Sequence, residues 1–165
     1  MTLEEYINSL SKGKQFNIAI RLTRLALTIW NKYADKNKLA YRDTVVGLHH
    51  SVDKNLLKNT INTVEKYIST SKAAIKNTEL LPLSKQFSDP IVALQDTDWE
   101  LPNEVVLTFY AVYNLLNSAL GEERKAASET IIYIAINQAI AALESSKLLT
   151  EAEIREVLYQ NKTGK

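Results

Sequence analysis

The spacing of apolar residues predicts that most of this chain is helical. Apolar side chains recur at every third or fourth position through residues 14–35 and again through residues 54–69, which places them on one face of an α-helix. Trp30 lies within the first of these faces, and we therefore expect its ring in the core. The polar run at residues 69–71 is expected to end or kink the second helix.

Two capping boxes mark the starts of short helices, one early and one late in the sequence. Thr2 is followed three residues later by Glu5, and Thr150 is followed in the same way by Glu153. In such a pair each side chain accepts a hydrogen bond from the backbone N–H of the other residue. We predict that a helix begins after each of these two threonines.

The most apolar helices are predicted in the last third of the chain. Asn103 can cap a helix that runs to about residue 120, where Gly121 suits the left-handed position that commonly ends a helix. A second helix is predicted over residues 122–145, and its segment 131–143 is apolar almost all round. A helix that is apolar on every side belongs in the centre of a bundle, so we expect this segment to be the most buried.

The stretches between these helices are interpreted from their helix-breaking residues. All three prolines, Pro82, Pro90 and Pro102, lie in one window of the chain. Each removes a helical N–H and biases the preceding residue toward extended geometry, so residues 78–102 are expected to be mostly loop, with one helical turn at most. A loop longer than about 15 residues is unusual in a compact domain and is often functional. Residues 41–50 have a helical pattern interrupted by one glycine.

Together these elements predict an all-α fold: a bundle of five to seven helices with one long Pro-containing loop, about residues 78–102, in a single domain that spans residues 1–165. The chain has 45% hydrophobic and 24% charged residues, as soluble globular proteins do. Its four Gly and three Pro residues are too few for a turn-rich β-sandwich or barrel. The absence of cysteine excludes disulfides, thiol catalysis and zinc–thiolate sites.

Charge is divided unevenly between the two halves of the chain. Residues 1–76 contain 13 Lys or Arg against 6 Asp or Glu, a balance of +7, and residues 77–165 contain 7 against 13, a balance of −6. The division either helps the two halves pack together or gives basic and acidic surfaces that select partners. The net charge of +1 gives no general attraction to nucleic acid, and the basic residues scatter around the first long helix, so nucleic-acid binding is not expected.

A cytoplasmic protein without a membrane segment is expected. The apolar stretch 131–143 is shorter than the ~20 residues needed to cross a bilayer. The start of the chain is acidic and amphipathic, unlike the basic start of a signal peptide.

No pattern of catalytic or metal-binding residues emerges from the sequence. His49 and His50 are adjacent, so on a helix they would point about 100° apart and could hardly serve one ion. Residues 96–100 imitate the start of a calcium loop, but Leu101 and Leu107 occupy the positions that require Gly and Glu. We therefore expect no metal, no cofactor and no catalytic residue, and we leave the question of enzymatic activity open.

A cluster of acidic residues around Trp99 forms the candidate partner-binding site. Tryptophan is a preferred anchor at interfaces, and carboxylates around it would attract a basic partner. This interpretation requires Trp99 to be at least partly exposed in the free protein. The alternative is that Trp99 turns inward and pins the loop to the bundle. The candidate residues are Asp96, Asp98, Trp99, Glu100 and Glu104.

Two blocks of the sequence, residues 16–22 with 30–33 and residues 112–122 with 140–143, have the pattern of long helices. They resemble, in that order, the opening long helix and the paired later helices of a bacterial all-helical family, the YjaG-like proteins. The resemblance implies an all-helical fold and supplies no catalytic residues. In its size, its lack of cysteine and its acidic loop with a Trp, the chain also resembles the small helical immunity proteins that inhibit bacterial toxins.

Three functional interpretations follow. The leading one is a non-catalytic bacterial interaction protein, and its most specific form is an immunity-type inhibitor of a basic toxin domain. The second is a ligand-binding or metal-assisted enzyme with a pocket between the bundle and the long loop. The third is a homodimeric protein of unknown role, in which the apolar surface of residues 103–120 is buried against a second copy.

Overall fold

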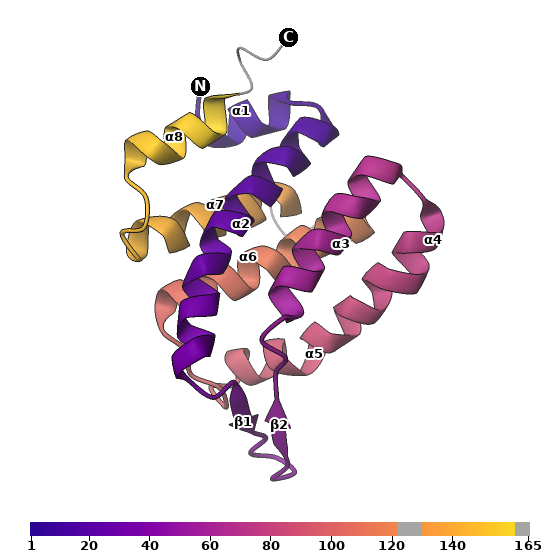
Figure 1. Ribbon diagram of the computed structural model, residues 1–165, viewed down its shortest axis with the longest axis vertical. Helices are drawn as coiled ribbons and strands as arrows, with labels where there is room; N and C mark the ends of the chain where they lie inside the picture. The colour runs from indigo at the N-terminus through magenta and orange to yellow at the C-terminus, as the bar shows by residue number, and fades with distance from the viewer. Residues whose placement is uncertain (122–129, 161–165) are drawn as a thin grey trace.

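The chain forms a bundle of helices with one small β-hairpin at its edge, in a computed structural model that describes residues 1–121 and 130–160 (Figure 1). Seven α-helices of seven residues or more lie within this part of the chain, which confirms the predicted all-α class. The elements are α1 (Leu3–Ser9), α2 (Lys12–Lys36), β1 (Ala40–Arg42), β2 (His49–Ser51), α3 (Leu56–Thr70), α4 (Ala73–Ile75), the π-helix η1 (Lys76–Leu80), α5 (Leu81–Gln95), α6 (Asn103–Leu120), α7 (Ile131–Ser145) and α8 (Glu151–Tyr159).

Both predicted capping boxes are present and begin α1 and α8. The Glu5 N–H donates to Thr2 Oγ1 at 3.1 Å, and the Thr2 N–H donates to the Glu5 carboxylate at 2.7 Å. The same reciprocal pair joins Thr150 and Glu153 at the start of α8. The Thr150 N–H and hydroxyl both donate to the Glu153 carboxylate and hold its pKa below the usual value. The carboxylate therefore supports this cap in its ionised form.

The helical pattern of residues 41–50 does not produce a helix, because this segment forms an antiparallel hairpin. β1 pairs with β2 so that Tyr41 lies opposite His50. Gly47 adopts a left-handed φ of 73°, which does not continue a helix. The carboxylate of Asp43 accepts hydrogen bonds from the backbone N–H groups of Val45 and Val46, at 2.8 and 3.2 Å. An aspartate that binds its own backbone in this way stabilises a turn rather than a helix.

The prediction of a long loop over residues 78–102 is wrong, because most of this window is helical. Only residues 96–102 connect helices. Pro82 lies in the first turn of α5, beside the π-helix η1, and a proline and a π-turn are both common causes of a bend. Pro90 lies inside α5 and removes one helical hydrogen bond. Its ring is buried in the same stretch as Phe87 and Ile91, and this burial offsets the cost of about 3 kcal/mol that an interior proline carries.

The core is built around α6 and α7, which pack against each other over their length. α2 covers both of them and α3 covers α6. α6 and α7 are buried to similar extents: ten of the eighteen residues of α6 are buried, against seven of the thirteen in the predicted segment 131–143. The expectation that this segment is the most buried is therefore not confirmed. Gly121 ends α6 with a left-handed φ of 73°, as predicted, whereas the predicted helix over residues 122–130 lies largely outside the described residues. No helix in the described ranges has both the length and the apolar character that a bilayer crossing requires.

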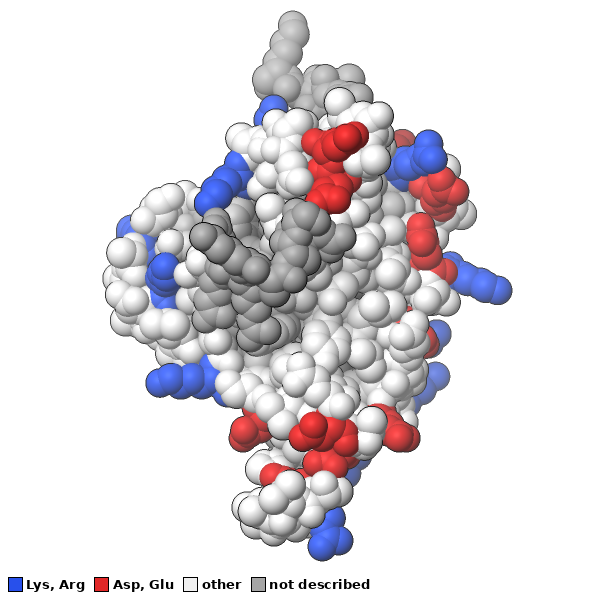
Figure 2. Space-filling view, turned by 180° about the vertical axis from the view of Figure 1, so that it is seen from behind, with Lys and Arg blue, Asp and Glu red and all other residues white. Residues whose placement is uncertain are grey.

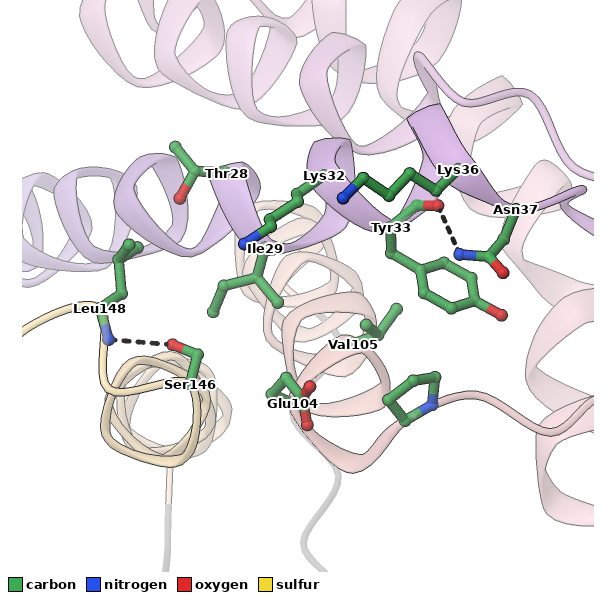
Figure 3. A pocket seen from close by; sticks show the side chains of 11 residues that line it. Thr28, Ile29, Lys32, Tyr33, Lys36, Asn37, Glu104, Val105, Ser146 and Leu148 are labelled. Atoms are coloured by element: carbon green, nitrogen blue, oxygen red, sulfur yellow. Dashed lines mark hydrogen bonds between the residues drawn. The ribbon is translucent and has the colours of Figure 1, made fainter.

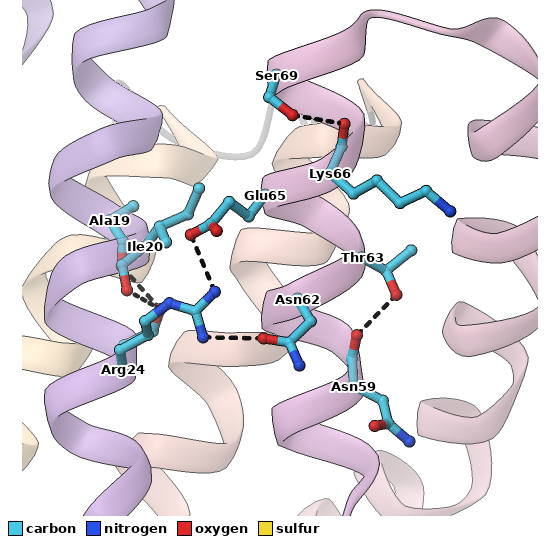
Figure 4. A network of polar contacts seen from close by, with 10 residues as sticks. Ala19, Ile20, Arg24, Asn59, Asn62, Thr63, Glu65, Lys66 and Ser69 are labelled. Carbon is cyan, nitrogen blue, oxygen red and sulfur yellow. Dashed lines mark hydrogen bonds and ion pairs between the residues drawn. The ribbon is translucent and has the colours of Figure 1, made fainter.

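Polar side chains join neighbouring helices at two junctions. Between α2 and α3, the guanidinium of Arg24 donates to Glu65 and to Asn62, each at 2.9 Å (Figure 4). Between α1 and α8, the Tyr6 hydroxyl donates to the carbonyl of Leu158 at 3.2 Å. The ion pair is largely exposed and contributes at most about 1 kcal/mol, so the apolar faces of these helices supply most of their attachment.

We expect truncation of Ile136 to destabilise the protein strongly, because this side chain is fully buried in α7. Ile136→Ala should lower the free energy of unfolding by about 2–5 kcal/mol. Val92→Ala is the control, since Val92 is an exposed apolar residue on α5 and its change should stay within about 0.5 kcal/mol. Denaturant titration followed by circular dichroism measures both values. Equal losses in the two variants would contradict the placement of α7 in the core.

Candidate functional site

The candidate site begins at Trp99, which lies in the connection between α5 and α6. Its ring is only 5% exposed, which contradicts the exposure that the interface interpretation requires and agrees with the alternative, in which Trp99 turns inward and pins the loop. The Trp99 N–H donates to the carbonyl of Ala93 at 3.1 Å, which folds the connection back onto the end of α5. Two residues earlier, Thr97 has a left-handed φ of 61°. This reversal turns the Trp99 ring into the protein and leaves the flanking carboxylates outside.

Trp99 completes an aromatic cluster that joins the hairpin to the bundle. Its ring meets Trp30 of α2 edge-on at 6.4 Å and Phe109 of α6 edge-on at 5.8 Å, measured between ring centroids. Tyr41 of β1 lies 5.5 Å away on a third side. Trp30 is fully buried, as predicted, and its indole N–H donates to the carbonyl of Lys54 at 2.9 Å. The tryptophan that the sequence suggested as an interface anchor therefore acts as a structural pin.

Asp98, next to Trp99, binds the turn of the hairpin. Its carboxylate accepts the hydroxyl of Thr44 at 2.9 Å and the Thr44 backbone N–H at 3.3 Å. Thr44 opens the turn between β1 and β2. One predicted site residue therefore has a defined role, which is to join the α5–α6 connection to the hairpin tip.

The other predicted carboxylates are divided between two features of the surface. Asp96 and Glu100 are exposed on either side of Asp98 and Trp99 in the α5–α6 connection. Glu104 is partly buried in the first turn of α6 and lines a separate pocket. The acidic cluster read from the sequence is thus a short acidic connection plus one helical residue with different neighbours.

The hairpin tip is a functional candidate that the sequence analysis missed. Val45, Val46 and Leu48 are 88%, 64% and 60% exposed and lie together around the turn. Besides the two hydrogen bonds to its carboxylate, Asp43 exchanges backbone bonds across the turn: its N–H donates to the carbonyl of Leu48, and its carbonyl accepts from Gly47, both at 2.8 Å. Apolar side chains are therefore held outward by an ordered backbone. The pattern Asp-Thr-Val-Val-Gly-Leu, a turn with apolar residues at its centre, was the available signal.

The two histidines lie on β2 and do not form a metal centre. The ring of His50 stacks on Tyr41 at 5.1 Å, and a pocket of about 260 Å³ between the hairpin and α5 contains His50 and Asp89. Burial, and then the carboxylates of Asp89 and Asp43, raise the pKa of Tyr41, so its phenol stays neutral. In residues 1–121 and 130–160 no group of three or more His, Cys, Asp or Glu side chains is placed to hold a metal ion.

A larger pocket, of about 400 Å³, lies between the end of α2, the start of α6 and the turn after α7 (Figure 3). Its lining is mostly apolar and includes Ile29, Tyr33 and Val105. Lys32 and Lys36 extend along the α2 side of this pocket (Figure 3). It is separate from the hairpin tip and has a different charge.

Comparison of the chain with protein-family models, curated proteins and solved structures finds no match. The resemblances to YjaG-like proteins and to immunity proteins therefore stay predictions.

We expect Trp99→Ala to destabilise the whole domain, because the ring fills the junction of α2, α6 and the hairpin. The free energy of unfolding should fall by about 3–5 kcal/mol, as for other buried aromatic truncations. Glu100→Ala, at the exposed neighbouring position, serves as the control and should change it by less than about 0.5 kcal/mol. Urea titration monitored at far-UV wavelengths measures both. A near-zero loss for Trp99→Ala would mean that the ring does not pin the connection.

Asp98→Ala should loosen the hairpin tip without unfolding the bundle. The variant removes both hydrogen bonds to Thr44, which together hold the turn by about 1–2 kcal/mol at this partly exposed position. Amide hydrogen exchange at residues 43–48 should accelerate about tenfold, while exchange in α6 stays unchanged. Asp96→Ala is the matched control because this exposed carboxylate has no hydrogen bond to the hairpin among the described residues. Equal acceleration in the two variants would contradict the role of Asp98.

Proposed function

We propose that this protein is a non-catalytic interaction protein that binds a basic protein partner through its hairpin end. The hairpin end comprises the apolar tip (Val45, Val46 and Leu48) and the neighbouring carboxylates of Asp96 and Glu100. This proposal keeps the acidic connection as part of the surface but replaces Trp99 with the hairpin tip as the apolar anchor.

The observation that carries the proposal is the exposure of three apolar side chains on an ordered turn. Val45, Val46 and Leu48 contribute little to the core, because most of each side chain is in solvent. Asp43 and Asp98 nevertheless fix the backbone that presents them, through hydrogen bonds to the turn. A pre-ordered apolar surface loses less entropy on binding than a flexible one, and grouped exposed apolar residues commonly mark interaction sites.

Charge gives the partner its expected sign. Figure 2 shows several carboxylate side chains gathered at the lower end of the molecule, just above the hairpin tip, with one Lys or Arg side chain at the very bottom. That end of the hairpin includes Arg42, which is exposed and lies near Gly47. Asp96 and Glu100 are exposed in the connection whose Asp98 binds the tip. Carboxylates around an apolar contact favour a basic partner with a hydrophobic recess, and they steer its approach. The most specific form of this proposal is an immunity-type inhibitor of a basic toxin domain.

Two alternatives are less well supported by the geometry. Apart from Asn103, no residue of α6 is classed as exposed, and Leu107, Tyr110 and Tyr113 are partly buried against the core. α6 therefore offers a second copy less apolar surface than the sequence suggested. The pocket between the hairpin and α5 gives the enzyme interpretation a location, but among the described residues no group of three or more His, Cys, Asp or Glu side chains is placed there to hold a metal ion.

The test places a photo-crosslinking residue at Val46 in cells of the source organism and identifies the captured protein by mass spectrometry. The control position is Val92, an exposed apolar residue on α5. We expect one basic protein to be captured from position 46 and not from position 92. With that protein purified, Val45→Ser/Val46→Ser should weaken binding about tenfold or more, whereas Val92→Ser should leave it unchanged.

The carboxylates are tested in the same binding assay. Asp96→Asn/Glu100→Gln should slow association and reduce its dependence on salt, while dissociation changes little. Capture of a second copy of the chain at position 46 would instead support the homodimer. Equal capture at both positions, or a partner whose binding ignores the hairpin variant, would contradict the proposal.

A further inference from the structure

The pocket beside the end of α2 has the dimensions of a small-molecule site. Its volume of about 400 Å³ lies within the roughly 300–1,000 Å³ that ligand pockets occupy. Ile29, Tyr33 and Val105 give it apolar walls. At its edge, Leu148 in the turn before α8 is 47% exposed, so an apolar side chain stands at the mouth with nothing in the described chain covering it fully.

Positive charge lies along one side of this apolar space. Lys32 and Lys36 are four residues apart on α2, so they occupy one face of the helix. Neither ammonium forms an ion pair with a side chain in residues 1–121 or 130–160. The facing helix α6 contributes Glu104, the single carboxylate among the described residues of the lining (Figure 3). In the described part of the chain, the pocket therefore combines apolar walls, two cations without ionic partners and one carboxylate across from them.

We propose that this pocket binds a monoanionic amphiphile, a molecule with an apolar chain or ring system and one carboxylate. The apolar part would lie against Ile29, Val105 and Leu148, where it removes apolar surface from water. The carboxylate would lie between Lys32 and Lys36, which supply charge-assisted hydrogen bonds. Glu104 disfavours ligands with a second negative charge on the α6 side. This site is independent of the hairpin end, and neither proposal requires the other.

Decanoate is the probe, and two control compounds distinguish the contribution of its apolar chain from that of its negative charge. Decylammonium has the same chain with the opposite charge, and inorganic phosphate is an anion without a chain. The two amphiphiles are titrated below the concentrations at which they form micelles, and phosphate is titrated over the same range. Amide shifts in the full chain are followed by ¹H–¹⁵N NMR. We expect decanoate to shift amides around the pocket, decylammonium to bind about threefold to tenfold more weakly, and phosphate to cause no shift there.

Variants of the lining assign each contribution. Lys32→Gln/Lys36→Gln should weaken decanoate binding about threefold to tenfold and remove its advantage over decylammonium. Leu148→Gln should weaken both amphiphiles alike, because it removes apolar contact. The control is Lys14→Gln/Lys58→Gln, which makes the same change in net charge at exposed lysines outside the pocket and should leave decanoate affinity within about twofold.

Four results would overturn the proposal. They are equal affinity for decanoate and decylammonium, equal losses in the lining and control lysine variants, decanoate shifts centred elsewhere in the protein, and no decanoate shift at all. Glu104→Gln provides an independent check, since removal of the facing carboxylate should strengthen decanoate binding and weaken that of decylammonium. A change in the opposite direction would also overturn the assignment.

Discussion

The Trp99 ring occupies the space in which α2, α6 and the hairpin meet, and its contacts with Trp30, Phe109 and Tyr41 reach all three elements. The connection has to reverse sharply to deliver the ring there, and Thr97 adopts a left-handed conformation that costs about 1–3 kcal/mol in a non-glycine residue. Burial of one large aromatic side chain can offset a cost of that size. The order of the hairpin, and hence the geometry of the exposed tip, follows from the core.

The uneven charge of the chain acts mainly at the surface. Of the three ion pairs within the described residues, only Lys66–Glu79 joins the basic first part of the chain to the acidic second part. The two parts pack through the apolar faces of α2, α3, α6 and α7 instead. Exposed carboxylates in the α5–α6 connection, and the lysines beside the α2 pocket that form no ion pair with another described residue, remain available for molecules outside the chain. The two proposed sites therefore select opposite charges.

Most helices could be predicted from the sequence because their signals are local. Thr2 and Thr150 reveal capping boxes within four residues, and the apolar spacing of α2 is visible within the helix itself. The wrong predictions concern segments whose conformation depends on contacts with residues distant in the sequence. Pro90 stays helical because its ring is buried by tertiary packing, and Trp99 turns inward because Trp30 and Phe109 surround it. The exposed tip could have been found from its turn, because Asp43 binds the backbone only two and three residues ahead.

The contact between α1 and α8 has a consequence for folding during synthesis. Tyr6 lies against Tyr159, with ring centroids 4.7 Å apart, and its hydroxyl reaches the carbonyl of Leu158. Ile7 beside it is fully buried, and α1 packs on α7. The α1 helix therefore completes its packing only after α7 and α8, which come much later in the sequence, have emerged from the ribosome. Because synthesis proceeds at about 5–20 residues per second, the apolar face of α1 stays in contact with water or with a chaperone for several seconds.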